Sequence, residues 1–150
     1  MRIAVLCKGR VEDLPPVMTV AMAAAQLGHD VYLITSFANE STTVELSRMN
    51  ISLINLGMKE SCRTGGYFNR ISYWTRFHRF AWSAVNRSGC DLLWIGTADT
   101  ALALGPRLLS RPYILQLLEL YDNVTVYRHL LRRYAQKAKC VVVPEETRAA

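Results

Sequence analysis

The chain has 150 residues, of which 51% are hydrophobic and 20% are charged, and its formal net charge is +6. This length suits one domain with a single core, and the hydrophobic content excludes a disordered chain. No run approaches the roughly 20 apolar residues that a membrane-spanning helix needs. The N-terminus lacks the order of a signal peptide, so we expect a cytoplasmic protein.

The positive charge is concentrated in the middle of the chain. Residues 1–60 carry five basic and six acidic side chains, whereas residues 61–139 carry twelve basic and four acidic ones. Such an excess favours an anionic partner, which can be a phosphorylated substrate, an anionic lipid or nucleic acid. A solvated basic surface explains it equally well. The aromatic residues show no repeated platform spacing, so we do not expect nucleic acid as a partner.

In chain order, the first unit is a strand, a helix that starts after Pro15-Pro16 and ends before Gly28, and a second strand. Four further apolar runs then alternate with helical patterns, which predicts an α/β, Rossmann-like three-layer sandwich with a mostly parallel sheet of about six strands. The predicted strands are 2–7, 31–35, 51–56, 91–95, 113–118 and 140–143, and the predicted helices are 17–27, 42–49, 67–87, 100–109 and 124–139. Residues 145–150 begin a helix that the chain does not finish, so we expect a fragment.

Several kinds of site have no support in the sequence. The turn predicted after the first strand holds only Gly9, so neither G-x-G-x-x-G nor a P-loop is present, and no G-x-S-x-G motif occurs. Lys8 and Arg10 either contact a phosphate there or lie in a solvated loop. Neither the cysteines nor the histidines have metal-ligand spacing, so we expect buried free thiols and no metal. These residues are Cys7, Cys62, Cys90, Cys140, His29, His78 and His129.

Acidic residues follow two of the predicted strands. In open α/β sheets, ligands bind at the carboxyl ends of the strands. Glu119 and Asp122 follow strand 113–118 and are the candidates for catalytic contact with a substrate, whereas Thr97 and Asp99 follow strand 91–95 and are candidates for substrate binding. The alternative is helix capping, because acids and hydroxyls before a first turn satisfy free N–H groups. We expect either Thr97 or Asp99 to cap the following helix.

Two predicted helices suggest a membrane surface. Helix 67–87 carries aromatic residues over more than one face, interleaved with arginines, which fits a bilayer interface or a lipid-linked acceptor. Packing on two sides is the alternative. Helix 124–139 has an apolar face that includes Leu130 and Tyr134, and an outer basic face that is either solvated or close to anionic headgroups.

Four phrases, in this order, carry a family resemblance: MRIAVLCKGR, AAAQLGHDVYLIT, DLLWIGTADTALAL and KAKCVVVPEETRA. Together they resemble the N-terminal half of a retaining nucleotide-sugar glycosyltransferase of the GT-B fold, of the group 1 or family 4 type. The resemblance implies that residues 1–150 bind the acceptor, and that an absent C-terminal domain binds the nucleotide-sugar as a co-substrate, with no other cofactor. It places Gly9 and Arg10 near the donor phosphates and Arg148 in the cleft.

The chain departs from this family pattern in two motifs. A single Gly9 replaces the family's Gly-Gly pair, and the segment LLELYD lacks the histidine of its His-Asp pair, so no catalytic histidine is carried over. We therefore expect the acceptor-binding half of a hexosyltransferase that acts on a glycan or lipid-linked acceptor and is inactive alone. We expect it in the cytoplasm, either free or peripheral to the inner membrane face. The donor domain would lie in cis or in a partner chain. The alternatives are a non-catalytic partner subunit that supplies acceptor and membrane contact, and a Rossmann-like domain for another phosphorylated ligand.

Overall fold

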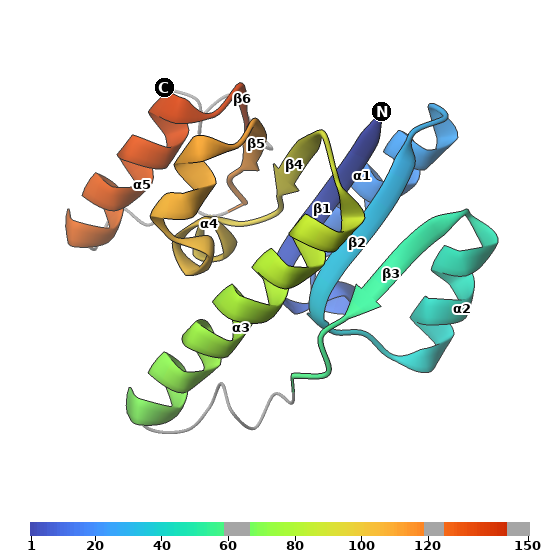
Figure 1. Ribbon diagram of the computed structural model, residues 1–150, viewed down its shortest axis with the longest axis horizontal. Coiled ribbons are helices and arrows are strands. Elements are labelled where there is room, and N and C mark those ends of the chain that lie inside the picture. Colours follow the sequence, from blue (N-terminus) through green and yellow to red (C-terminus); the bar gives the residue numbers. More distant parts are fainter. Residues whose placement is uncertain (59–66, 119–124, 144–150) are drawn as a thin grey trace.

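A computed structural model describes residues 1–58, 67–118 and 125–143 (Figure 1). Its centre is one open sheet of six strands, all parallel, in the order β3-β2-β1-β4-β5-β6. This arrangement confirms the predicted α/β class and the number of strands. The strands are β1 (Arg2–Arg10), β2 (Asp30–Phe37), β3 (Ile51–Asn55), β4 (Leu92–Ile95), β5 (Tyr113–Gln116) and β6 (Cys140–Val142).

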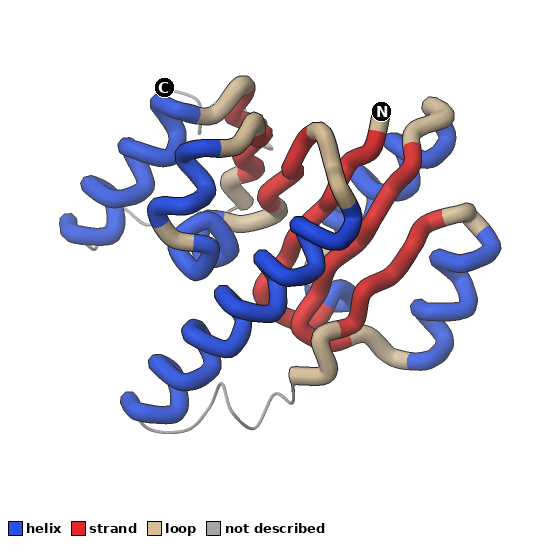
Figure 2. The backbone as a smooth tube through the Cα atoms, viewed as in Figure 1, coloured by secondary structure: helices blue, strands red, loops and turns tan. Residues whose placement is uncertain are grey.

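Helices cover both faces of the sheet, which gives three layers (Figure 2). One face holds α1 (Pro15–Gln26) and α2 (Glu40–Arg48), and the other holds α3 (Tyr67–Ser88), α4 (Ala98–Leu104) and α5 (Thr125–Lys137). Short 3-10 turns follow β1 and α4, at η1 (Val11–Asp13) and η3 (Pro106–Ser110). Among the described helices, none combines the length and hydrophobicity needed to cross a bilayer.

Alternation along β1 divides the core into two layers. Val5 and Cys7 face α1, whereas Ala4 and Leu6 face α3 and α4, and all four are completely buried. A strand with helices on both faces needs apolar residues at successive positions, which explains the unbroken run that predicts this strand.

The boundaries differ from the predicted ones in two informative places. The expected turn at Lys8–Arg10 is wrong, because β1 continues to Arg10 with a register irregularity after Cys7. Gly9 lies in this irregular stretch with φ +150°, a conformation that side-chain-bearing residues rarely adopt. The predicted helix 100–109 is divided at Gly105 (φ 66°), after which Pro106 begins η3.

Helix α3 is buried along part of its length and exposed at its N-terminal end. Tyr73, Phe77 and Trp82 are buried against the core, and the Trp82 indole N–H donates to the Leu104 carbonyl at 2.9 Å. Phe68, in the first turn, is 85% exposed. The C-terminal part of this helix is therefore structural, while its N-terminal turns extend beyond the core (Figure 1).

Candidate functional site

The strand order of the sheet reverses between β1 and β4. From β1 the chain continues into α1 on one face, and from β4 it continues into α4 on the other. The loops after these two strands therefore separate at the carboxyl edge, which is where open α/β sheets bind ligands.

The side chain of Lys8, near the end of β1, is almost fully buried there, with 6% exposed. Its Nζ lies 3.4 Å from Asp99 Oδ2 and 4.5 Å from the centroid of the Trp74 ring. A buried ammonium group is costly unless it is paired. The carboxylate and the face of the indole both offset this cost, so the charge of Lys8 is compensated from inside the fold.

Asp99 connects this buried cation to the surface. Its other oxygen, Oδ1, accepts a hydrogen bond from the hydroxyl of Tyr127 on α5, and its side chain is 39% exposed. It lies in the first turn of α4, where the helix dipole favours a negative charge. Residues from β1, α3, α4 and α5 thus fix one partly exposed carboxylate at the switch point.

The capping question is settled in favour of Thr97. Its side chain accepts the backbone N–H of Thr100 at 3.1 Å, and Thr97 is the N-cap of α4. The Thr100 hydroxyl in turn accepts the backbone N–H of Lys8 at 2.8 Å. The cap therefore ties the start of α4 to β1 and leaves the Asp99 side chain to pair with Lys8. Contact of Thr97 and Asp99 with a substrate remains a prediction.

Gly9 and Arg10 lie at the same edge, beside β2. The Gly9 carbonyl accepts the Thr35 hydroxyl at 2.8 Å, and Arg10 Nε lies 3.8 Å from Glu12 Oε2. The guanidinium also lies 5.8 Å from the Phe37 ring centroid. Arg10 is thus held among neighbours of its own chain, and its contact with donor phosphates remains a prediction.

Glu12 is held by several donors. Its Oε1 accepts the backbone N–H of Asn39 at 2.7 Å. Burial works to raise the pKa of this carboxyl, but the Asn39 N–H, further hydrogen bonds and nearby Arg10 together outweigh burial and lower that pKa below its ordinary value. Glu12 therefore stays ionised and braces the loop between β2 and α2.

The remaining predicted site residues, Glu119, Asp122 and Arg148, lie outside the described residues. Their assignment to substrate contact therefore remains a prediction. In the described part of the chain, no three His, Cys, Asp or Glu residues are grouped so that they could hold a metal ion.

Sequence reasoning missed the role of Lys8 and the participation of Tyr127 and Trp74. A signal for Lys8 was present, because Ala4, Leu6 and Lys8 occupy alternate positions of one strand and so share the face covered by α3 and α4. A charged residue that continues an apolar alternation is expected to find a buried partner. The partners come from distant helices, and no local pattern indicated them.

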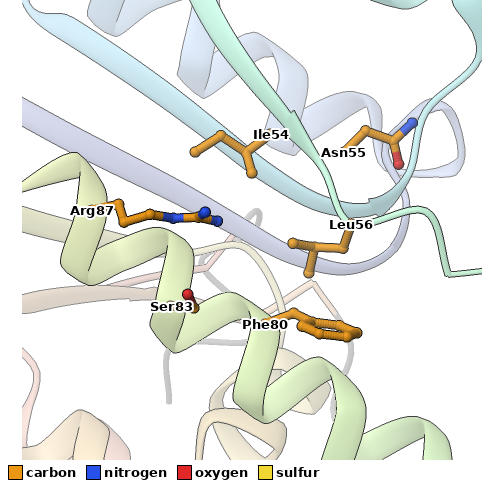
Figure 3. A pocket seen from close by; sticks show the side chains of 6 residues that line it. All are labelled: Ile54, Asn55, Leu56, Phe80, Ser83 and Arg87. Carbon is orange, nitrogen blue, oxygen red and sulfur yellow. The ribbon is translucent and has the colours of Figure 1, made fainter.

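Two hollows lie away from this site. One is a cleft of about 220 Å³ between β3 and α3, where Arg87, Ser83 and Phe80 of the helix face Ile54 of the strand and Leu56 just after it (Figure 3). The other, of about 340 Å³, lies on the α1 face and is almost entirely apolar. Its lining includes Val20 and Leu27 of α1 and Leu92 and Trp94 of β4.

Comparisons with known proteins give a likeness in fold. No protein-family model matches the chain, and no curated protein matches it. Among solved structures, a glycosyltransferase from Rickettsia africae ESF-5 aligns with a TM-score of 0.63 and 15% identity over 95% of this chain and 36% of its own. MurG from Acinetobacter baumannii gives 0.58 and 15% over 95% and 40% of the two chains.

Another similar structure is that of an enzyme with a different activity. The UDP-GlcNAc 2-epimerase from Methanocaldococcus jannaschii aligns with a TM-score of 0.51 and 11% identity over 97% of this chain and 40% of its own. At these identities the likeness concerns the fold, which hosts different chemistries. This chain spans less than half the length of these proteins. It has the α/β fold of a Rossmann-like part of GT-B glycosyltransferases.

Proposed function

We propose that this chain is the acceptor-binding part of a glycosyltransferase, which transfers a sugar from a nucleotide-sugar to a glycan or lipid-linked acceptor. The observation that carries the proposal is the position of Asp99. Its partly exposed carboxylate lies at the switch point of a fold that glycosyltransferases share, fixed by Lys8 and Tyr127.

The chemistry of this cluster suits sugar hydroxyl groups. An ionised carboxylate only accepts hydrogen bonds, and such charge-assisted bonds are stronger than neutral ones. Trp74, which is half-buried beside Lys8, adds an aromatic surface close to that carboxylate. A substrate rich in hydroxyl groups could therefore donate a hydrogen bond to the fixed carboxylate of Asp99 and pack against the ring of Trp74. Lys8 and Tyr127 act as positioning residues, because they hold that carboxylate in place.

The same cluster is poorly suited to a phosphate. Lys8 is 6% exposed and its charge is compensated by Asp99, so its ammonium group is not presented to an anion at the carboxyl edge of the sheet. A carboxylate at the surface repels an anion. These observations favour an acceptor hydroxyl at Asp99, while the phosphates of the donor are assigned to a second domain, in cis or in a partner chain.

Transfer itself requires that second domain. Catalysis of group transfer depends on positioning and on stabilising the departing phosphate across a closed site. The chain corresponds to 36% and 40% of two structurally similar transferases. We therefore expect the 150 residues to bind acceptor without transferring sugar. Turnover of a nucleotide-sugar and an acceptor by this chain alone would contradict that division of roles.

The test is binding of the chain to a glycan array, followed by NMR titration of the glycans that bind. Asp99→Asn keeps the shape of the side chain but removes its charge, and we expect at least a tenfold loss of affinity, the value of one charge-assisted hydrogen bond of about 1.5–3 kcal/mol. Asp30→Asn is the matched control, because Asp30 is exposed at the start of β2, on the opposite edge of the sheet. Unchanged glycan binding by Asp99→Asn would refute the site.

A sugar-nucleotide enzyme of another type is the second candidate, and the similarity to the epimerase favours it. Such an enzyme would bind the nucleotide-sugar and no separate acceptor. Binding of a nucleoside diphosphate sugar together with no binding on the glycan array would support this candidate over the transferase.

A further inference from the structure

The edge strand β3 leaves one side of its backbone unpaired. It lies at the end of the sheet and pairs with β2, so the N–H and C=O groups that point away from β2 have no strand partner in the described part of the chain. Folded proteins usually protect such an edge with charged residues, proline or a very short strand. The strand Ile51–Asn55 has five residues and contains neither a charge nor a proline, whereas β6 at the opposite edge has three residues. The edge of β3 is therefore open to pairing.

A cleft of about 220 Å³ lies beside this edge, between β3 and α3 (Figure 3). Ile54 and Leu56 are two positions apart and so share the face of the sheet that α3 covers. Phe80, which is 43% exposed, lines the cleft from the helix. The fold buries these three side chains only in part. A partner that packs on them therefore removes apolar surface from water.

The flank of α3 beside this cleft is positively charged. Arg87 and Ser83 line the cleft, and the guanidinium of Arg87 forms no ion pair with any residue that the structure describes. The guanidinium of Arg76 lies 6.0 Å from the centroid of the Phe80 ring. Residues 76, 80, 83 and 87 follow one another at spacings of three and four, so they share one side of the helix. Helix α3 contains no acidic residue, and the cleft thus combines apolar walls with a cationic rim.

We propose that the edge of β3 and this cleft bind an extended acidic peptide segment of a partner protein, which joins the sheet as an additional strand. In complexes of this kind, main-chain hydrogen bonds give affinity and pockets for alternate side chains give specificity. An apolar side chain of the segment packs between Ile54 and Phe80, and a carboxylate two residues away pairs with Arg87. The inference concerns a surface different from that of Asp99 and does not depend on the proposed function.

Size and charge favour a peptide over two other occupants. Pockets for small ligands and cofactors have volumes of about 300–1,000 Å³, so a cleft of about 220 Å³ suits side chains better than a whole ligand. A second copy of the chain would pair through the same surface on both molecules. That pairing brings two cationic rims into one interface, where like charges repel each other. An acidic segment is attracted to the rim instead.

The test is NMR titration of the isotope-labelled chain with the peptide acetyl-Thr-Val-Thr-Glu-Thr-Val-Thr-amide. The amide signals of residues 51–55 should shift, and a peptide with Lys in place of Glu should bind about tenfold more weakly, because attraction to the rim becomes repulsion. Arg76→Gln/Arg87→Gln should weaken binding of the Glu peptide by about tenfold, at roughly threefold for each exposed ion pair. The matched control is Arg48→Gln/Arg132→Gln, which removes two exposed charges away from the cleft and should leave binding unchanged.

N-methylation of the peptide tests the strand pairing itself. Successive residues of an added strand point their N–H groups to opposite edges, so methylation of every second nitrogen, in one of the two registers, should abolish binding. Binding of both methylated peptides as tightly as the parent, an equal loss in the control double variant, or no shift of residues 51–55 would each overturn the proposal. A dimer of the chain that already shifts these signals without peptide would overturn it in favour of a second copy. Circular dichroism of every variant separates these outcomes from unfolding.

Discussion

The ammonium group of Lys8 lies 3.4 Å from the carboxylate of Asp99, and this contact joins the end of β1 to the first turn of α4, the helix that follows β4. One partner is buried and the other is partly exposed. The Lys8 side chain therefore belongs to the core, whereas the Asp99 carboxylate reaches the surface.

We predict that Lys8→Met destabilises the fold by about 1–3 kcal/mol, because it leaves a partly buried carboxylate without its cation. This loss of stability is smaller than the loss expected for a fully buried ion pair, because Asp99 is partly solvated. Urea denaturation of both single variants and of Lys8→Met/Asp99→Asn gives a double-mutant cycle. The double variant should be more stable than the sum of the single losses predicts. Strict additivity would show that the two side chains do not interact.

A second prediction concerns Gly96, which follows β4 at the same edge. A Cβ at this position would lie 2.6 Å from a methyl group of Val17 on α1 and 3.1 Å from the Leu6 carbonyl oxygen. We expect Gly96→Ala to lower the free energy of unfolding by about 1–3 kcal/mol, the usual effect of overpacking.

The rescue variant for Gly96 is Val17→Ala. It removes the nearest methyl groups, so Val17→Ala/Gly96→Ala should recover part of the loss, measured by thermal and urea denaturation. The absence of any recovery would mean that the Leu6 backbone, rather than Val17, sets the limit at this position.

The sequence predicts the elements of this fold well because each one has a local cause. Burial on both faces of the sheet makes residues 3–7 of β1 apolar without a break, and Pro15 and Gly28 bracket α1. The site was harder to predict, because its contacts are not local. Asp99 was recognisable from its position after a strand, but its pairing with Lys8 depends on how β1 and β4 meet in the sheet. Helix α5, which brings Tyr127, starts far from both strands in the sequence.

The third prediction concerns alkaline pH and the thiol of Cys7. Burial raises the pKa of this thiol from its ordinary value of 9.0 to about 12, although its hydrogen bond to Thr35 works in the opposite direction. The folded state therefore keeps the proton that the unfolded state loses. This contribution to stability is complete below pH 9 and is lost as the pH rises toward 12, at about 1.4 kcal/mol per pH unit for one proton.

Denaturation between pH 8 and 12 in wild type and Cys7→Ala tests the contribution of the thiol, using the pH range that its pKa defines. The free energy of unfolding of Cys7→Ala should fall less steeply with rising pH than that of wild type. Some slope should remain, because burial also raises the pKa of Tyr113 to about 12. Thiol labelling is a second readout: Cys140 is exposed and should react at once, whereas Cys7 is buried and should react only after unfolding. If the free energy of unfolding fell with pH at the same rate in wild type and in Cys7→Ala, the proposed contribution of the Cys7 thiol would be contradicted.

The last prediction concerns acid. Because the pKa of Glu12 is lowered in the folded state, its charged form stabilises the fold at neutral pH, and this stabilisation is lost as the pH falls from the ordinary value of 4.5 through the folded pKa. In that range the unfolded state binds the proton first. Glu12→Gln should therefore be less stable than wild type at pH 7, and the difference should shrink toward pH 3. Glu45→Gln, on the exposed side of α2, is the matched control for the removal of one carboxylate from the surface. If the stability difference between Glu12→Gln and wild type stayed constant from pH 7 to pH 3, the brace between Glu12 and Asn39 would not depend on the charge of the carboxyl group.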